Sequence, residues 1–134
     1  MPTTPAPALG YVLVYVPDVA RAIDFWQRAF GLAVGFVHDS GTYAELATGA
    51  TALGFVDETL TEANGGRFRK NRPDGEPAGI ELALTMADVD AAWARALAAG
   101  ATAVKAPSQK PWGQTVAYVR DPDGVLVELC TPIG

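Results

Sequence analysis

Three glutamates stand inside strand-like, mostly apolar runs of this 134-residue chain. Glu45 lies in GTYAELAT, Glu81 in GIELALT and Glu128 in GVLVELCT. A carboxylate in such surroundings is costly to desolvate unless a cation, an arginine or lysine, or protonation compensates its charge. The three glutamates are therefore candidates for general acid–base chemistry, for binding a divalent ion, or for attracting a cationic ligand.

The elements that must position these glutamates occur twice. The runs GYVLVYVPD and GIELALTMAD each give a glycine, a strand-like stretch and an aspartate suited to cap a helix. Helices with one apolar face are predicted after Asp18 and Asp88, and they end at Gly31 and Gly100. Superposing Asp18 on Asp88 places Tyr11 on Glu81.

The remaining strands complete two similar halves. AVGFVHD, GTYAELAT and ATALGFVD follow the first helix, which gives the order β-α-β-β-β. TVAYVRD and GVLVELCT supply late strands in the second half, where we superpose YAEL at 43–46 on LVEL at 126–129. The sequence predicts an internal duplication within an α+β fold.

The predicted boundaries follow from loss of periodicity. Residues 1–8 are predicted to be a flexible leader, and residues 9–134 a single domain. Within that domain module one covers 9–57, a linker or lid 58–78, and module two 79–132. The linker carries a basic cluster that is suited either to a solvated surface or to a lid offering cations: Arg67, Arg69, Lys70 and Arg72.

Alternation along each strand divides its residues between a helix-packed face and an opposite face. The opposite-face sets are Tyr11, Leu13 and Tyr15; Tyr43, Glu45 and Ala47; Glu81, Ala83 and Thr85; and Leu126, Glu128 and Cys130. If helices cover one side of each sheet, the polar members of these sets converge on the other side.

Composition excludes several classes of function. The formal net charge of −5 argues against a phosphate-binding surface, so no nucleic-acid partner is expected. The one cysteine, Cys130, cannot form an internal disulfide. No stretch reaches the roughly 20 apolar residues of a membrane span, so we expect a soluble cytoplasmic protein without a membrane partner.

Three motifs carry a family resemblance that covers about residues 9–132. They are VPDVARAIDFWQRAFGL, MADVDAAWARALAAGA and PWGQTVAYVRDPDGVLVEL. With them the chain resembles the vicinal oxygen chelate superfamily, which includes glyoxalase I, bleomycin-resistance proteins and extradiol dioxygenases. The resemblance implies tandem βαβββ modules forming a curled sheet around a cleft, usually within a homodimer.

The resemblance also implies a metal site at up to four positions, which fall here on Tyr11, Glu45, Glu81 and Glu128. The first and third positions are most often histidine in the metalloenzymes, and this chain has histidine at neither. Without imidazoles Fe²⁺, Zn²⁺ and Ni²⁺ lose preferred ligands, whereas Glu45, Glu81 and Glu128 suit Mg²⁺ or Mn²⁺. The expectation is therefore either no cofactor or one divalent ion: Mg²⁺, Mn²⁺, Ni²⁺ or Zn²⁺.

A second group of residues predicts a pocket with aromatic walls. Trp112, between Pro111 and Gly113 at a strand entrance, is suited to wall a flat ligand. The predicted ligand-binding residues are Tyr11, Tyr15, Tyr43, Trp112, Gln114 and Tyr118. Trp26 and Trp93 are predicted to pack in the core, and His38, the only histidine, is expected at the surface.

Three interpretations remain open. The first is a dimeric small-molecule binding protein of the bleomycin-resistance type, which sequesters a drug or metabolite without turnover. The alternative is a metal-dependent lyase or isomerase of the glyoxalase kind, in which Glu81 or Glu128 is the catalytic residue that moves a proton. A scaffold that only dimerises is a third reading, in which arginines would neutralise the glutamates.

Overall fold

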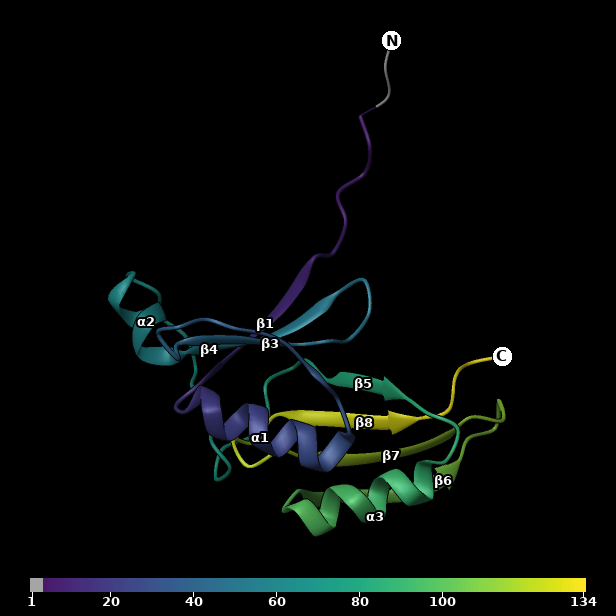
Figure 1. The fold of residues 1–134 in the computed structure, drawn as a ribbon. Helices are drawn as coiled ribbons and strands as arrows, with labels where there is room; N and C mark the ends of the chain where they lie inside the picture. The colour runs from purple at the N-terminus through teal and green to yellow at the C-terminus, as the bar shows by residue number, and fades with distance from the viewer. Residues whose placement is uncertain (1–3) are drawn as a thin grey trace.

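A computed structural model describes residues 4–134 and shows one βαβββ module following another (Figure 1). Residues 1–3 of the predicted leader lie outside the described residues. Module one contains β1 (Tyr11–Val16), α1 (Val19–Phe30), β2 (Val34–Val37), β3 (Tyr43–Leu46) and β4 (Ala52–Asp57). After α2 (Glu58–Ala63), module two contains β5 (Leu82–Thr85), α3 (Val89–Ala99), β6 (Thr102–Gln109), β7 (Thr115–Arg120) and β8 (Leu126–Cys130).

The two modules have the same sheet topology. The strand orders are β1-β4-β3-β2 and β5-β8-β7-β6, so each first strand lies at an edge and runs parallel to the last strand of its module. The remaining neighbours pair antiparallel. This topology confirms the predicted α+β fold of tandem βαβββ modules.

Equivalent caps delimit the two long helices. The Asp18 carboxylate accepts a 3.0 Å hydrogen bond from the Arg21 backbone N–H, and Asp88 accepts one of 3.0 Å from Ala91. These bonds satisfy free N–H groups of each first turn. Gly31 and Gly100 end the helices with φ values of 71° and 110°, a region that favours glycine.

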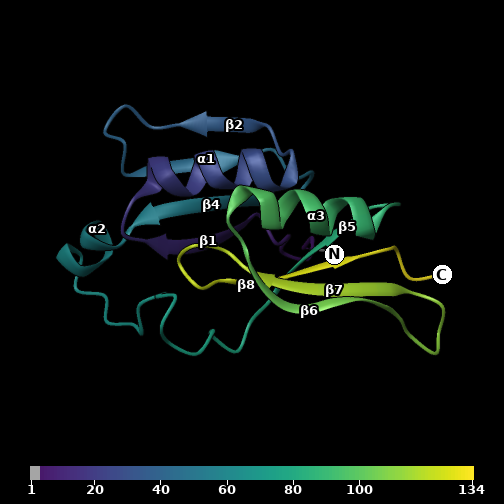
Figure 2. The same cartoon turned by 90° about the horizontal axis from the view of Figure 1, so that it is seen from below.

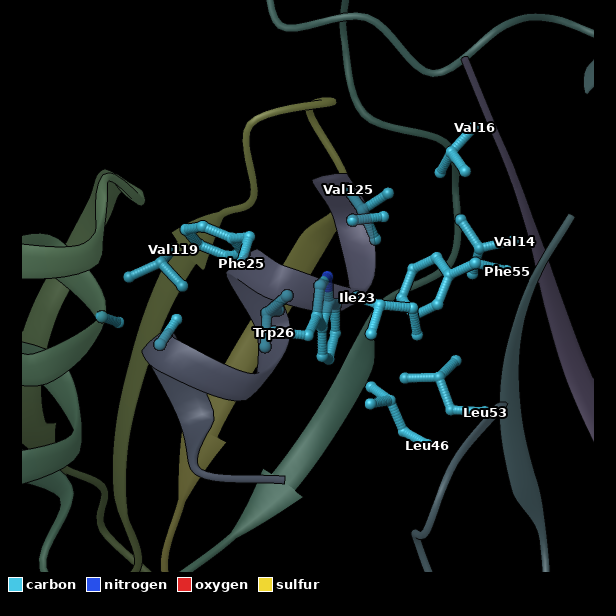
Figure 3. Packing of buried hydrophobic residues seen from close by; sticks show 14 of the residues in the cluster. Val14, Val16, Ile23, Phe25, Trp26, Leu46, Leu53, Phe55, Val119 and Val125 are labelled. Atoms are coloured by element: carbon cyan, nitrogen blue, oxygen red, sulfur yellow. The ribbon is translucent and has the colours of Figure 1, made fainter. Parts of the chain in front are cut away.

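Helix α1 forms a core shared by both sheets. Its buried face, which includes Ile23, Phe25 and Trp26, belongs to one hydrophobic cluster with residues of both sheets, such as Phe55 on β4 and Val119 on β7 (Figure 3). Figures 1 and 2 show α1 in the angle between the two sheets, with α3 beside it. The helix-free face of each sheet, called here its open face, therefore points away from α1.

The strand order corrects one superposition made from the sequence. β3 and β7 are each the third strand of a module, and β4 and β8 each the fourth. Glu45 pairs with Gly54, and Tyr118 pairs with Glu128. Glu45 is therefore equivalent to Tyr118, and Gly54 to Glu128, so superposing YAEL on LVEL was wrong. The two segments are similar in sequence, but YAEL lies in the third strand of its module and LVEL in the fourth.

Two elements were not predicted. The linker opens with α2, whose N-cap Asp57 accepts a 2.8 Å hydrogen bond from the Thr59 N–H. β6 was also missed, because its sequence TAVKAPSQ combines Pro107 with polar residues. None of the helices within residues 4–134 has the length and apolar character needed to traverse a bilayer.

Candidate functional site

The open face of module two brings two of the predicted glutamates together. Glu81 directly precedes β5, and Glu128 lies in the middle of β8, paired on one side with Ala83 and on the other with Tyr118. The small Ala83 leaves space beside the two carboxyls. The Tyr118 hydroxyl donates a 2.8 Å hydrogen bond to Glu128 Oε1.

The proximity of these groups shifts their acidity. Partial burial, together with the charge and hydrogen bonding of the nearby Glu128 carboxyl, raises the pKa of Glu81. The hydrogen bond to Glu128, aided by burial, raises the pKa of the Tyr118 phenol to about 12. Burial and the same carboxyl raise the pKa of the Cys130 thiol to about 11. Glu81 is thus the group on this face suited to hold a proton beside a second carboxyl.

Trp112 and Gln114 adjoin this face and have different roles. The Trp112 indole N–H donates a 2.9 Å hydrogen bond to Gln114 Oε1, while Gln114 Nε2 donates one of 2.7 Å to the Thr131 carbonyl. Gln114 is buried and uses both its amide oxygen and its amide nitrogen in these bonds, whereas Trp112 is 64% exposed. The indole is therefore held in place with much of its surface uncovered.

Module one carries the remaining predicted residues on its own open face. The Tyr43 hydroxyl donates a 2.9 Å hydrogen bond to Glu45 Oε2, and burial together with this bond raises the pKa of Tyr43 to about 12. Tyr11 is 61% exposed, and Tyr15 packs edge-on against Phe68 of the linker. This face is more aromatic than that of module two.

Gly54 explains how the Tyr43 side chain fits. A Cβ atom at Gly54 would stand 2.9 Å from the Tyr43 hydroxyl and 2.8 Å from Leu13 Cδ2. Both modules thus contain a tyrosine–glutamate pair, but module one builds it within β3 and module two across β7 and β8. Gly54 is not predictable as a site residue from the sequence, because a residue without a side chain carries no chemical group that could single it out.

One chain does not gather all three glutamates. Glu81 and Glu128 lie on one open face and Glu45 on the other. Across residues 4–134 there is no group of three or more histidine, cysteine, aspartate or glutamate residues arranged to hold a metal ion. The positions in module one equivalent to Glu81 and Glu128 are Tyr11 and Gly54. A donor set of two carboxylates without imidazole does not fit the family's metal site within one chain.

The cavities near this region are modest. A hollow of about 180 Å³ reaches Glu81, with Val12, Ala83 and Thr51 among its lining residues. A second, of about 300 Å³, lies between β1, the linker and the start of β8. A third, of about 630 Å³, is lined by residues of α1, β5 and α3 and so lies mainly on the helix-covered side. Pockets for drug-sized ligands usually span about 300–1,000 Å³, so a cleft of that size over the open faces requires a further surface.

The basic linker cluster is largely occupied by structural contacts. Arg72 forms a bidentate ion pair with the buried Glu58, and Lys70 lies 3.2 Å from Glu62. Arg69 donates to the Pro77 carbonyl. Arg120 on β7 donates to carbonyls that include Gly75 and Gly124. These arginines do not neutralise the Glu81–Glu128 pair.

The DPDG motif has a structural role. Asp121 is buried and accepts hydrogen bonds from Trp26 Nε1 on α1 and from the backbone N–H groups of Asp123 and Val125. Asp123, also buried, pairs with Arg21 of α1. The motif therefore fastens module two to the helix of module one, and it lies outside the candidate site.

Comparison with known proteins finds one matching protein family and relatives that cover most of the chain. The family model described as Glyoxalase/Bleomycin resistance protein/Dioxygenase superfamily matches residues 8–129. An uncharacterized protein of Mycobacterium bovis, Mb0911c, is 37% identical over 132 residues, which cover 95% of this chain and 84% of that protein.

Solved structures agree on the fold. A glyoxalase-related enzyme from Fulvimarina pelagi superposes with a TM-score of 0.79 at 21% identity, covering 95% of this chain and 89% of the other. A glyoxalase/bleomycin resistance protein/dioxygenase family enzyme from Burkholderia phytofirmans gives a TM-score of 0.76 at 24% identity, covering 93% and 98%.

Proposed function

This chain belongs to the glyoxalase/bleomycin resistance protein/dioxygenase superfamily, and from that premise we propose that it is a homodimeric small-molecule binding protein. Its ligand, a drug or metabolite, is held in a cleft lined by the open faces and is sequestered without turnover. A cytoplasmic location is part of the same proposal.

The observation that carries this proposal is the Glu81–Glu128 pair on the open face of module two, and the same module also presents the exposed indole of Trp112. Two neighbouring carboxyls without an arginine partner attract a cation. An exposed indole offers a flat apolar surface and a cation–π partner. The arrangement favours a basic aromatic ligand, whose ammonium group would take the place of the proton on Glu81.

A second copy supplies the cover that the cleft needs. The open face of module one leaves Tyr11, Leu13 and Phe36 substantially exposed. Contiguous apolar surface of this kind marks an interaction site more often than a free surface. In a dimer the aromatic face of module one from one copy would lie opposite the acidic face of module two from the other.

A panel of basic aromatic compounds tests the proposal through the melting temperature. At ligand concentrations about 100 times Kd, binding stabilises the folded state by about 2.7 kcal/mol, which gives a clear thermal shift. Saturable binding without product, reduced at least tenfold by Glu128→Gln, supports the proposal. Glu76→Gln, which removes one charge from the exposed linker, is the matched control. A panel in which no compound shifts the melting temperature contradicts it.

The raised pKa of Glu81 beside Glu128 favours one second candidate, a metal-dependent lyase or isomerase. Such a pair is suited to move a proton next to a carbonyl. Titration of purified protein with Mg²⁺, Mn²⁺, Ni²⁺ and Zn²⁺ separates the two functions. Stoichiometric binding that Glu128→Gln abolishes supports the enzyme. The absence of binding, together with a saturable organic ligand, supports the binding protein.

A further inference from the structure

We propose that the cavity of about 300 Å³ between β1, the linker and the start of β8 is a second binding site, which takes an apolar molecule carrying one carboxylate. The cavity is formed within one chain, and neither Glu81 nor Glu128 lines it. The inference therefore goes beyond the proposed function, because it concerns a different site and a ligand of the opposite charge.

The floor of this cavity is part of the shared hydrophobic core. Val14 on β1 and Val125 just before β8 line it, and each is 9% exposed. Leu82 of β5 adds a half-buried aliphatic side chain. A hollow lined in this way offers water few hydrogen-bonding partners, so an apolar group that displaces the water is bound favourably.

The linker forms the roof of the cavity, and contacts with both modules hold it in place (Figure 2). Phe68 packs edge-on against Tyr15 with the ring centroids 4.8 Å apart, and Asn71 Nδ2 donates a 3.1 Å hydrogen bond to the Tyr15 carbonyl. On the side of module two, Arg120 donates a 2.6 Å hydrogen bond to the Gly75 carbonyl. The site is therefore largely formed before a ligand arrives, which lowers the entropy cost of binding.

The rim of the cavity carries an uncovered aliphatic side chain. Ile80 lines the cavity and is 71% exposed. Glu81, the next residue, lines the neighbouring hollow of about 180 Å³ instead, because successive side chains of an extended chain point to opposite sides. The apolar cavity therefore opens to solvent without turning the acidic pair of module two towards its ligand.

A single cation stands at this cavity. Among residues 4–134, Arg69 is the one charged residue that lines it, and its Nη2 donates a 3.1 Å hydrogen bond to the Pro77 carbonyl. Lys70 and Arg72 are paired with glutamates of α2, whereas Arg69 forms no ion pair in the described part of the chain. A guanidinium presents several N–H donors in a planar fork that matches a carboxylate. The free donors of Arg69 are therefore suited to an anionic group.

Charge and burial together define the ligand class. The apolar part of the ligand would fill the space between Val125 and Phe68, and its carboxylate would lie at the rim against Arg69. Within residues 4–134 no aspartate or glutamate lines the cavity, so a basic group would find no counter-ion there. Octanoate has the required chemistry and is the probe. Octylammonium, with the opposite charge, and acetate, without the apolar chain, are the matched controls.

The isoleucines allow binding to be located in the full-length protein. The chain has three, Ile23, Ile80 and Ile133, so a sample labelled at the isoleucine δ1 methyl groups gives one NMR signal for each. On titration with octanoate the Ile80 signal should shift saturably, because this side chain lines the cavity. Ile133, which is 81% exposed and does not line it, is the internal control. Octylammonium and acetate should each bind at least about tenfold more weakly than octanoate.

Two linker substitutions separate the charge from the cavity. Arg69→Gln should weaken octanoate binding about tenfold or more, because charge-assisted hydrogen bonds are lost. Arg67→Gln is the matched control, since it removes the same charge from the same linker at a position that does not line the cavity. Ala78→Phe, at an exposed position that lines the cavity, should abolish binding by filling the space. The melting temperature of each variant shows that it is folded.

Several results would overturn the inference. They are the absence of a saturable Ile80 shift, equal affinity for octanoate and octylammonium, equal effects of Arg69→Gln and Arg67→Gln, and a folded Ala78→Phe variant that binds like the parent. Glu128→Gln should leave octanoate binding unchanged, and a loss of octanoate binding in that variant would place the carboxylate in the cleft and overturn the second site. Basic aromatic ligands that bind while octanoate does not would leave the proposed function standing alone.

Discussion

The indole Nε1 of Trp26 donates a 3.0 Å hydrogen bond to the Asp121 carboxylate, and the two side chains are 0% and 2% exposed. Trp26 belongs to α1 of module one, and Asp121 begins the turn between β7 and β8 of module two. The bond therefore links the two modules inside the core. The Asp121 carboxylate also accepts hydrogen bonds from the backbone N–H groups of Asp123 and Val125, and these bonds fix the turn itself.

The Asp121→Asn substitution should destabilise the protein. The amide would present a donor where Asp121 accepts, so that either Trp26 or the turn loses a buried hydrogen bond. The expected loss is about 1–3 kcal/mol of unfolding free energy, measured by urea denaturation. A double-mutant cycle with Trp26→Phe should give a coupling energy of about 1 kcal/mol or more. Additive effects would show that the bond contributes no coupling.

The same residue predicts a dependence on pH. Burial raises the pKa of Asp121 above 3.8, so the folded state holds this proton more tightly than the unfolded state. Its contribution to stability is complete below 3.8 and is lost as pH rises through the raised value. The stability of the parent relative to Asp121→Asn should therefore be greatest in acid and fall with rising pH. A difference that is constant over this range contradicts the prediction.

The two tyrosine–glutamate pairs can be separated by titration. Glu128→Gln removes the carboxylate that accepts from Tyr118, so the pKa of Tyr118 should fall from about 12 towards the usual tyrosine value of 10.0. Glu45→Gln should lower the pKa of Tyr43 in the same way. Titration of the two variants by NMR, with the resonances of each tyrosine ring assigned, is the measurement. Each variant is the control for the other, and a shift of the wrong tyrosine would refute the pairing.

Gly124 should tolerate no side chain. Its φ is 94°, and a Cβ atom there would overlap the Arg72 carbonyl and the Arg120 guanidinium. Gly124→Ala should cost more than about 2 kcal/mol, because steric overlap adds to left-handed strain. Gly113 is the control, since its φ is 96° and nothing lies within 4 Å of such a Cβ. Gly113→Ala should cost about 1 kcal/mol. Equal losses in urea denaturation would count against the overlap.

Much of the fold was accessible from the sequence because local rules determine it. Asp18 and Asp88 cap helices, and Gly31 and Gly100 end them, through contacts within a few residues. Strand alternation also placed Glu128 on the open face of its strand, where Tyr118 reaches it. These features depend on periodicity and capping, which a linear pattern records.

The remaining features depend on contacts between distant residues. The sequence did not show that Arg72 pairs with Glu58 or that Arg120 holds the linker carbonyls, because neither spacing has a local signature. The prediction from the sequence also placed Glu45 together with Glu81 and Glu128. No local sequence pattern indicates that α1 lies between the two sheets and separates their open faces. Gly54 shows the same limit, because its importance comes from the Tyr43 side chain that fills the space above it.

Because α1 packs against both sheets, the ancestral halves are no longer independent folding units. A fragment ending at residue 57 would expose the part of the α1 core that now includes Val119 and Val127 of module two, and a fragment starting at residue 79 would keep α3 but lack α1. The intact chain should unfold cooperatively in one transition. Separately expressed halves should regain structure only when they are mixed, by fragment complementation.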